Sequence, residues 1–357
     1  MPSRWRPCAT AHPEPRTRRC VLRAAWRCTL AAALGWQATA ALAQSVLAEP
    51  PPAVRFGVLP VGGAVESRGN WTPLLDDLSR ALGRPVSVLS VTSYESLAQA
   101  LRRDDIDFAL LSAKLALDAV AERRMNVLAQ VARVDGLPDG RALLLARRTG
   151  PLSSLKELLA HPERWRLARG DSRSVSGFIV PQLQLFLPNG ILMETRFQSE
   201  IVDTHQATAL AVANGDADVA TNNTIDFERF RQQFPAEADR LHVIWQSEPI
   251  PAAVFVMRRA HPLALQKKLQ DFLVDYGHTK GPRGDGEREV LKSLHAPFGY
   301  VAADNTALLP AAELDYQLAK RRALAAMWVN AEARAARLER IERSHAQQVA
   351  VLRDGRP

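Results

Sequence analysis

Cysteine is confined to one end of this 357-residue chain, because Cys8, Cys20 and Cys28 all lie within the first 28 residues. The remainder therefore has no disulfide bond, no thiol nucleophile and no cysteine metal site. Four histidines stand too far apart to form a metal-ligand motif; these are His242, His261, His278 and His295. We therefore expect neither a metal ion nor another cofactor.

Residues 1–43 are predicted to be a targeting segment that is not part of the fold. Arginines crowd its start, and an alanine-rich apolar stretch follows at 29–42. That stretch is too short to stay in a membrane, and it ends in the small-x-small pattern Ala41-Leu42-Ala43. The pair Arg18-Arg19 also resembles a twin-arginine signal, so both export routes stay open. Cleavage near Ala43 without a lipid anchor predicts a soluble protein of the periplasm.

The basic character of the chain belongs largely to this leader. The whole sequence has 46 basic and 38 acidic residues. The leader holds seven arginines and one acid, which leaves 39 basic and 37 acidic residues and a net charge of +2. A balance so close to neutral gives no support for a nucleic-acid partner.

Strand and helix patterns alternate from Val54 to Val134, which predicts an α/β fold with largely parallel sheets. The pattern also repeats at an offset of 111 residues, so that Tyr94 matches His205 and Ser112 matches Asn223. The first pair stands at helix starts and the second at strand ends. Ligands of open α/β sheets bind beyond the carboxyl ends of strands. Two similar lobes with a cleft between them are therefore expected.

Composition shifts suggest where the lobes and the tail begin. We predict lobe 1 at 54–147 and 250–310, lobe 2 at 148–249, and a helical tail at 311–357. The segment Leu314–Leu352 has no glycine or proline and predicts one long helix or a broken pair. This tail either packs along one lobe or forms a homodimer or docking contact. Its candidate contact residues are Leu324, Met327, Trp328 and Leu338.

A loop rich in small residues, Gly170 to Gly177, leads into an apolar run. Such a loop at a helix start can bind an anion, because the first backbone N–H groups lack helical partners and the helix dipole favours negative charge. The loop has no lysine, which favours reversible capture of an oxyanion over chemistry on it. The alternative is a helix cap that binds nothing. Pro181 predicts that the helix starts late or is kinked.

Three stretches make the chain resemble the phosphonate-binding family of ABC-transporter solute-binding proteins, which includes phosphate and phosphite binders. The first is the loop Gly170–Pro181, which is similar to the family signature Asp-x-x-Ser-Thr-Ser-Gly-Phe-x-x-Pro. The second runs from Ala209 to Thr224, and the third from Val243 to Pro251. The resemblance covers about Val54 to Gly277 and, more weakly, the tail.

The resemblance implies a two-lobed periplasmic binding protein fold of type II with a hinge. It also implies a set of ligand-binding residues, namely Tyr94, Ser174, Val175, Ser176, Gly177 and His205. A weaker set is Arg141, Asn222, Thr224 and Asp226. Without the resemblance, Tyr94 would be interpreted as a packed aromatic residue and His205 as a helix cap or core histidine.

Departures from the family pattern predict either a change in specificity or a drifted site that no longer binds phosphorus oxyanions. Val175 replaces the family's central threonine, and Gly140 aligns with a second cleft tyrosine. Ile225 and Ala253 stand where members that take aminoalkylphosphonates carry carboxylates, while Asp226 is one residue off and is expected to point elsewhere. A buried ammonium without a carboxylate is not tolerated. We therefore expect phosphate, phosphite, an alkylphosphonate or a similar oxyanion, but not an aminoalkylphosphonate.

Arg141 stands beside the missing tyrosine. It either reaches a second anionic group of the ligand or is a solvated surface residue.

Three functions remain on the sequence alone. The first is capture by hinge closure and delivery to an ABC permease at the inner membrane. The alternative is a sensor of the same fold that signals to a membrane kinase. An enzyme with Ser176, His205 and Asp226 as a triad is the third. The loop lacks the Gly-x-Ser-x-Gly pattern, so we expect no enzymatic activity.

Overall fold

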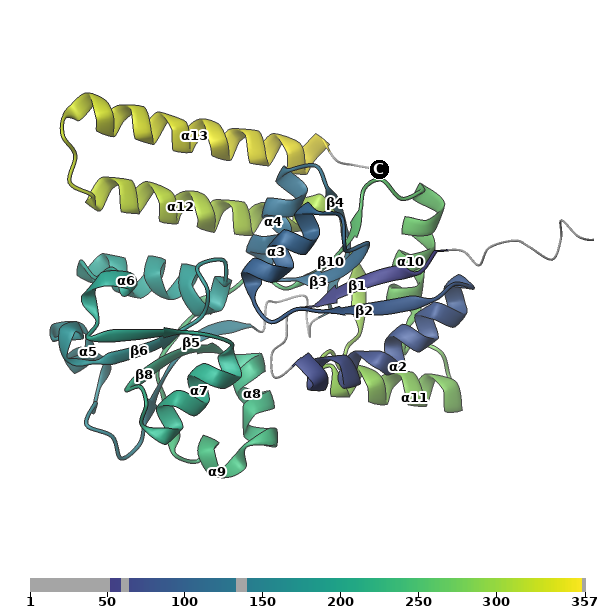
Figure 1. Cartoon of the computed structure of the whole chain (residues 1–357), viewed down its shortest axis with the longest axis horizontal. Coiled ribbons are helices and arrows are strands. Elements are labelled where there is room, and N and C mark those ends of the chain that lie inside the picture. Colours follow the sequence, from purple (N-terminus) through teal and green to yellow (C-terminus); the bar gives the residue numbers. More distant parts are fainter. Residues whose placement is uncertain (1–51, 59–63, 133–139, 355–357) are drawn as a thin grey trace, which may run out of the picture. The chain divides into compact units, whose positions relative to one another are not determined.

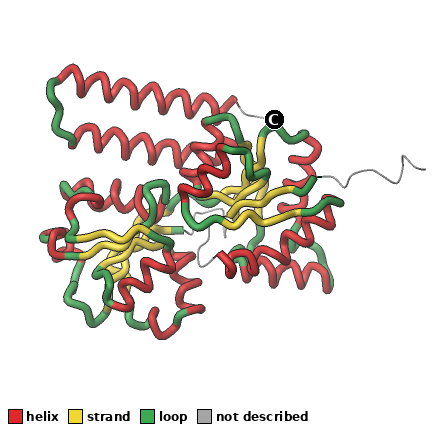
Figure 2. Tube along the Cα trace, in the orientation of Figure 1, coloured by secondary structure: helices red, strands yellow, loops and turns green. Residues whose placement is uncertain are grey.

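Two β-sheets organise the described part of the chain (Figure 1, Figure 2). The computed structural model describes residues 52–58, 64–132 and 140–354. The leader predicted at 1–43 lies outside these residues. Among the described helices, none is both long and apolar enough to cross a membrane.

The first sheet has six strands in the order β11-β4-β10-β3-β1-β2. Its strands are β1 (Val54–Val58), β2 (Val86–Ser90), β3 (Phe108–Leu111), β4 (Met125–Val131), β10 (Val254–Arg258) and β11 (Tyr300–Ala302). β1 runs parallel to β2 and β3, whereas β10 runs antiparallel to β3 and β4, and β11 runs antiparallel to β4. We call the part built on this sheet lobe 1.

The second sheet has five strands in the order β7-β6-β8-β5-β9. Its strands are β5 (Arg141–Arg147), β6 (Arg166–Arg169), β7 (Ser199–Val202), β8 (Val219–Asn223) and β9 (Leu241–Pro249). β6 is parallel to β7 and β8, and β5 is antiparallel to β8 and β9. We call the part built on this sheet lobe 2.

Two sequence-based expectations need correction. The predicted lobe 1 segment 54–147 extends too far, because β5 pairs with β8 and β9 in the second sheet. The chain therefore crosses between lobes before Arg141. The sheets are also mixed rather than largely parallel. The chain crosses between the lobes twice, and the first strand after each crossing is β5 in lobe 2 and β10 in lobe 1. Each of these strands lies inside its sheet and runs antiparallel to both neighbours.

Helices flank both sheets (Figure 1). Those of lobe 1 are α2 (Ala64–Leu82), α3 (Tyr94–Arg102), α4 (Ala113–Ala121), α10 (Leu263–Asp275) and α11 (Pro282–Ser293). Those of lobe 2 are α5 (Leu155–Ala160), α6 (Met193–Arg196), α7 (His205–Asn214), α8 (Thr224–Gln233) and α9 (Pro235–Ala238). Lobe 2 also contains the wide-turn helices η3 (Val175–Ile179) and η4 (Pro181–Phe186). Short 3₁₀ turns complete the set, namely η2 (Pro162–Arg164), η5 (Leu187–Asn189) and η6 (Asn305–Leu308).

The 111-residue repeat has a physical counterpart at the start of β1 and β6. Arg55 donates its backbone N–H and its Nε to Oδ2 of Asp107, at 3.0 and 2.9 Å. Arg166 does the same to Oδ2 of Asp218, at 2.9 and 3.1 Å. In both lobes the arginine Nη2 bonds the other carboxylate oxygen. The bond between β1 and the residue before β3 is thus repeated between β6 and the residue before β8.

The C-terminal tail is a pair of helices, α12 (Leu309–Ala325) and α13 (Ala331–Asp354), rather than one long helix. α12 packs on α4 of lobe 1 and on η4 of lobe 2. Lys114 Nζ lies 3.1 Å from a carboxylate oxygen of Asp315, and Arg322 Nη2 lies 2.6 Å from one of Glu194. The tail therefore bonds to both lobes instead of lying along one.

The four candidate contact residues of the tail differ in exposure. Met327 is fully exposed and Leu324 is 44% exposed, whereas Trp328 is half-buried and donates its indole N–H to the carbonyl of Ala323. Leu338 is half-buried on α13. Their use in a homodimer stays a prediction.

Candidate functional site

The anion loop predicted from the sequence is the start of a helix with an occupied cap. Ser174 precedes η3, and its Oγ accepts the N–H of Gly177 at 2.9 Å. The N–H of Ile179 reaches back five residues to the Ser174 carbonyl. Among the described residues, the N–H groups of Val175 and Ser176 have no acceptor. These are the two backbone donors that the helix start offers to an anion.

Gly177 shapes this loop from behind. A Cβ at Gly177 would lie 2.7 Å from Cα of Gly170, so the two backbones touch. Thr221 of β8 joins them, because its hydroxyl donates to the Gly177 carbonyl at 2.8 Å and accepts the Gly170 N–H at 3.1 Å. Gly177 itself does not line the cavity described below. The structure thus gives it a positioning role behind the loop.

Pro181 neither delays nor breaks the helix. η3 and η4 form wide π-turns, and Val180 between them keeps right-handed helical angles. Pro181 is the first residue of η4, where its missing N–H costs least. The late start or kink predicted from the sequence is therefore replaced by a change of helix type.

Ser176 and His205 face each other. Oγ of Ser176 lies 2.9 Å from Nε2 of His205, and Nδ1 of the ring lies 3.3 Å from the Thr221 carbonyl oxygen. Burial lowers the pKa of His205, so the ring is neutral at pH 7. Since a carbonyl only accepts, the ring proton is assigned to Nδ1, and Nε2 accepts the Ser176 hydroxyl. Asp226 does not occupy the third position of a triad, because the Thr221 carbonyl does.

Tyr94 approaches the same loop from lobe 1. It is the first residue of α3, as His205 is of α7, and the preceding Ser93 and Thr204 cap the two helices alike. Burial raises the pKa of the Tyr94 hydroxyl, against the opposing influence of the nearby Ser174 and Ser112 hydroxyls. The phenol is therefore a proton donor at neutral pH. The repeat thus brings its two helix starts to one place.

These residues line one cavity of about 640 Å³ between the two lobes. A cavity of this size suits a small organic ligand. Lobe 2 contributes Ser174, Val175, Ser176, Thr204, His205 and Asn223. Lobe 1 contributes Asn70, Trp71, Tyr94, Ser112, Ala253 and His295. Oγ of Ser112 is buried and makes no hydrogen bond of good geometry among the described residues.

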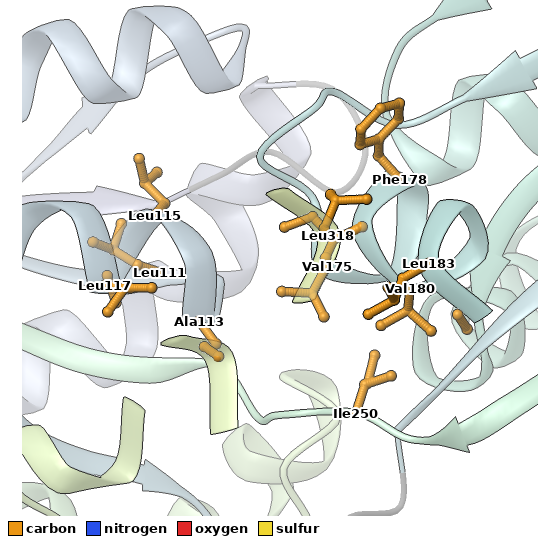
Figure 3. Packing of buried hydrophobic residues seen from close by; sticks show 14 of the residues in the cluster. Leu111, Ala113, Leu115, Leu117, Val175, Phe178, Val180, Leu183, Ile250 and Leu318 are labelled. Atoms are coloured by element: carbon orange, nitrogen blue, oxygen red, sulfur yellow. The ribbon is translucent and has the colours of Figure 1, made fainter. Parts of the chain in front are cut away.

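Val175 belongs both to the cavity lining and to the buried apolar core. It lines the cavity and is only 5% exposed, within a buried cluster that includes Phe178, Leu183 and Leu318 (Figure 3). Val175 therefore contributes to the apolar core as well as to the start of η3. Its side chain offers no hydroxyl to a ligand.

Two of the positions that depart from the expected family pattern, Gly140 and Ile225, lie beside Ile250 and form an apolar wall of the cavity. A Cβ at Gly140 would lie 3.5 Å from a side-chain carbon of Ile250 and 3.8 Å from one of Ile225. All three residues line the cavity, as does Ala253. No carboxylate stands at these four positions.

Three of the weaker candidates do not line the cavity. Arg141 donates Nη1 to the Ser247 carbonyl at 2.8 Å, so its guanidinium is held on β9. Thr224 accepts the N–H of Arg141 at 3.2 Å. Asn222 is buried and donates to the His205 carbonyl at 2.9 Å. It therefore positions His205 rather than meeting a ligand.

Asp226 does line the cavity, contrary to the expectation that it points elsewhere. Oδ2 accepts Nδ2 of Asn223 at 2.7 Å, and Oδ1 accepts Nη1 of Arg229 at 3.3 Å. Sequence reasoning left Asn223, Arg229 and His295 out of the site. The repeat could have found Asn223, since it matches Ser112. No local pattern marked the other two.

No group of three or more His, Cys, Asp or Glu residues that could hold a metal ion occurs among the described residues. The polar groups of the cavity are hydroxyls, amides, two imidazoles, the carboxylates of Asp171 and Asp203, and the Asp226–Arg229 pair. Such a set can bind an oxyanion by hydrogen bonds. Two mixed α/β lobes around this cavity define a solute-binding protein of the type II periplasmic class.

Comparison with known proteins gives the family. Residues 56–308 match the family model of the ABC transporter, phosphonate, periplasmic substrate-binding protein. The chain is 32% identical to the phosphonates-binding periplasmic protein of Escherichia coli strain K12, over 74% of this chain and 77% of that protein. The chain therefore belongs to the phosphonate periplasmic substrate-binding proteins of ABC transporters.

Solved structures agree with this assignment. A binding protein component of an ABC phosphonate transporter from Pseudomonas aeruginosa is similar with a TM-score of 0.78 and 29% identity, covering 85% of this chain and 98% of that one. PhnD1 from Prochlorococcus marinus, solved with methylphosphonate, shares the fold with a TM-score of 0.66 and 17% identity, over 75% and 98% of the two chains.

Proposed function

We propose that this periplasmic binding protein captures a phosphonate, phosphite or phosphate whose substituent carries no positive charge. The observation that carries the proposal is the set of hydrogen-bond donors that the two lobes bring to one cavity. The N–H groups of Val175 and Ser176 and the Ser176 hydroxyl belong to lobe 2. The Tyr94 hydroxyl comes from lobe 1. Hydrogen bonds to a charged oxygen contribute about 1.5–3 kcal/mol each, so a few of them suffice for micromolar binding.

Donors from both lobes also suggest how binding moves the protein. An oxyanion that bonds to Ser176 and Tyr94 together stabilises conformations in which the lobes are close. The form with closed lobes would then dock on an ABC permease of the inner membrane. We further propose that the leader is removed near Ala43, and that the exposed side chains of Leu324, near the end of α12, and Met327, just after it, serve a homodimer.

Exclusion of a cationic tail rests on the apolar wall. Gly140, Ile225 and Ala253 offer no carboxylate to an ammonium group. Burying an ammonium against such a wall without a partner costs several kcal/mol. Asp226, the lining carboxylate that directly follows Ile225 in the chain, is already paired with Arg229. 2-Aminoethylphosphonate should therefore bind weakly.

Calorimetric titration of the exported protein tests the proposal, after unfolding and refolding to remove any carried ligand. The ligands are phosphate, phosphite, methylphosphonate, ethylphosphonate and 2-aminoethylphosphonate. We expect tight binding of at least one of the first four and at least tenfold weaker binding of the last. Tight binding of 2-aminoethylphosphonate would contradict the exclusion of cationic tails. Absence of binding to all five would contradict the proposed ligand class.

Absence of enzymatic activity is part of the proposal. The Ser176–His205 pair could activate a hydroxyl, but the surrounding donors suit reversible binding of an anion. Incubation with nitrophenyl phosphate and a nitrophenyl ester is expected to give no turnover. Turnover that Ser176→Ala abolishes would contradict this part alone.

A further inference from the structure

One group of polar side chains in the cavity is not used by the anion loop. It consists of Asp226 and Arg229 on α8 of lobe 2 and His295, which follows α11 of lobe 1. The inference drawn from these residues rests on the proposed function, because it concerns the substituent of the bound oxyanion.

Arg229 has unused hydrogen-bonding capacity. Its side chain is 17% exposed, and among the described residues its one hydrogen bond joins Nη1 to Oδ1 of Asp226 at 3.3 Å. Strong charge-assisted bonds of this kind measure about 2.7–2.9 Å. A guanidinium has five N–H donors, so most of the donors of Arg229 are available to a molecule in the cavity.

Asp226 lies close to the anion loop. Nδ2 of Asn223 donates to Oδ2 of Asp226 at 2.7 Å and to Oγ of Ser176 at 3.3 Å. Because both bonds share that nitrogen, the distance between Ser176 Oγ and Asp226 Oδ2 cannot exceed the sum of the two bond lengths. A substituent of two carbons on an oxyanion held by Ser176 can span such a gap.

His295 supplies a third polar group from the opposite lobe. It is half-buried, and it is near enough to Arg229 and Asp226 for both charges to act on its ring. Burial, together with the Arg229 charge, lowers the pKa of His295, so the imidazole is neutral at pH 7. A neutral imidazole offers one donor and one acceptor.

The net charge of this group is zero, but it still offers hydrogen-bond donors and acceptors to a ligand. Asp226 and Arg229 carry opposite charges, and His295 is neutral. An ammonium group would meet the guanidinium, and a carboxylate would meet Asp226. A hydroxyl group adds no charge, accepts from Arg229 and donates to Asp226 or His295.

We propose that Asp226, Arg229 and His295 form a second subsite that binds a hydroxyl group on the short substituent of the oxyanion. The ligand class is then a hydroxyalkylphosphonate with two carbons between phosphorus and oxygen. The apolar wall at Ile225 and Ile250 covers the carbon atoms between the two polar ends. Arg229 and Asp226 determine specificity. Because each neutralises the charge of the other, neither attracts a substituent of opposite charge.

A matched ligand series tests the subsite by calorimetry. 2-Hydroxyethylphosphonate, propylphosphonate and 2-aminoethylphosphonate have the same number of heavy atoms and differ at the terminal group, and phosphonoacetate adds a carboxylate. We expect 2-hydroxyethylphosphonate to bind at least about tenfold more tightly than propylphosphonate, the ratio that one hydrogen bond to a charged group provides. We also expect it to bind more tightly than the two ligands with charged ends.

Two variants should change the preference in opposite directions. Arg229→Gln leaves the Asp226 carboxylate without its counter-ion, so 2-aminoethylphosphonate should gain relative to 2-hydroxyethylphosphonate. Asp226→Asn leaves the guanidinium uncompensated, so phosphonoacetate should gain. Arg231→Gln on the same helix is the control, because Arg231 is exposed and does not line the cavity. Propylphosphonate binding and circular dichroism establish that each variant is folded.

The outcomes separate the subsite from the proposed function. Propylphosphonate binding as tightly as 2-hydroxyethylphosphonate would contradict the hydroxyl subsite and leave oxyanion capture intact. Unchanged ligand ratios in both variants would do the same. Binding of none of the phosphonates by the unaltered protein would contradict the proposed function, and the subsite with it.

Discussion

Nε2 of His205 lies 2.9 Å from the hydroxyl oxygen of Ser176, so the start of α7 is joined to the start of η3. His205 cannot donate through Nε2 while its proton sits on Nδ1, and the hydrogen bond therefore runs from serine to histidine. Asn223 approaches the same oxygen at 3.3 Å. The serine hydroxyl is thus held in place before a ligand arrives, and it can turn its proton to an incoming oxyanion.

Ser176→Ala should weaken binding of the preferred phosphonate by about 10- to 100-fold, because one hydrogen bond to a charged oxygen is lost. Calorimetric titration at pH 7 measures the change. Ser153→Ala is the control, since its hydroxyl bonds to Glu157 on the exposed surface. An unchanged dissociation constant for Ser176→Ala would remove Ser176 from the binding site.

Val175→Thr tests what the missing hydroxyl of the loop costs. Threonine has nearly the same shape, and its hydroxyl could reach the oxyanion, so affinity should rise by roughly tenfold. The hydroxyl would also enter a site only 5% exposed among apolar side chains, which should lower the free energy of unfolding by about 1–3 kcal/mol.

Titration and urea denaturation measure the two effects separately. Val180→Thr is the matched control, because Val180 belongs to the same cluster, is fully buried and does not line the cavity. It should lose stability without gaining affinity. Equal affinities for Val175→Thr and the unaltered protein would mean that position 175 does not face the oxyanion.

Much of the site could be predicted because it depends on local sequence. The loop around Ser174 is defined by neighbouring small residues, and the 111-residue repeat relates Tyr94 to His205 through equivalent capped helices. The two helix starts follow equivalent strands of the two sheets. When the lobes pack against each other, Tyr94 and His205 therefore line the same cavity. Loop composition and spacing therefore indicated where these residues lie, whereas the ligand-binding roles of Tyr94 and His205 were implied only by the family resemblance.

The errors have equally specific causes. Asn222 was chosen over Asn223, although successive strand residues point to opposite faces and Asn222 is the buried one. The strand pattern of β5 does not encode which sheet it joins. Arg229 and His295 approach each other only through the packing of the two lobes, and no spacing in the sequence relates them.

Glu95 and Arg173 form an ion pair between α3 of lobe 1 and the anion loop of lobe 2. The hydrogen bond from Arg173 lowers the pKa of Glu95, so the carboxylate is charged at neutral pH. Each residue adjoins a ligand-binding candidate, Tyr94 or Ser174. The pair therefore adds attraction between the lobes beside the ligand.

Glu95→Gln should increase the dissociation rate of the ligand, by no more than about fivefold because the pair is exposed. The difference should disappear in about 1 M salt, where charges are screened over about 3 Å. Stopped-flow measurements at low and high salt test this. Glu289→Gln, which removes an ion pair within α11, should leave the rate unchanged. A salt-independent effect would rule out an electrostatic attraction between the lobes.

Asp107 should make the protein sensitive to acid in a defined range. Burial opposes ionisation of this carboxyl, but hydrogen bonds from Arg55 and His261 outweigh it and hold the pKa of Asp107 at about 2. Arg258 also pairs with it at 2.6 Å. Because the pKa is lower in the folded state than in the unfolded chain, the stabilisation is complete above pH 4. It is lost as the pH falls from about 4 to about 2.

Asp107→Asn removes this charge at every pH. At pH 7 the variant should be less stable than the unaltered protein by on the order of 1–2 kcal/mol, and the difference should shrink as the pH falls through the same range. Urea denaturation at a series of pH values measures it. Asp218→Asn should behave alike, since Arg166 repeats the arrangement in lobe 2, whereas Asp285→Asn, at a position 70% exposed, should have little effect. A difference between Asp107→Asn and the unaltered protein that stays constant from pH 7 to pH 2 would mean that the ion pairs of Asp107 contribute nothing to stability.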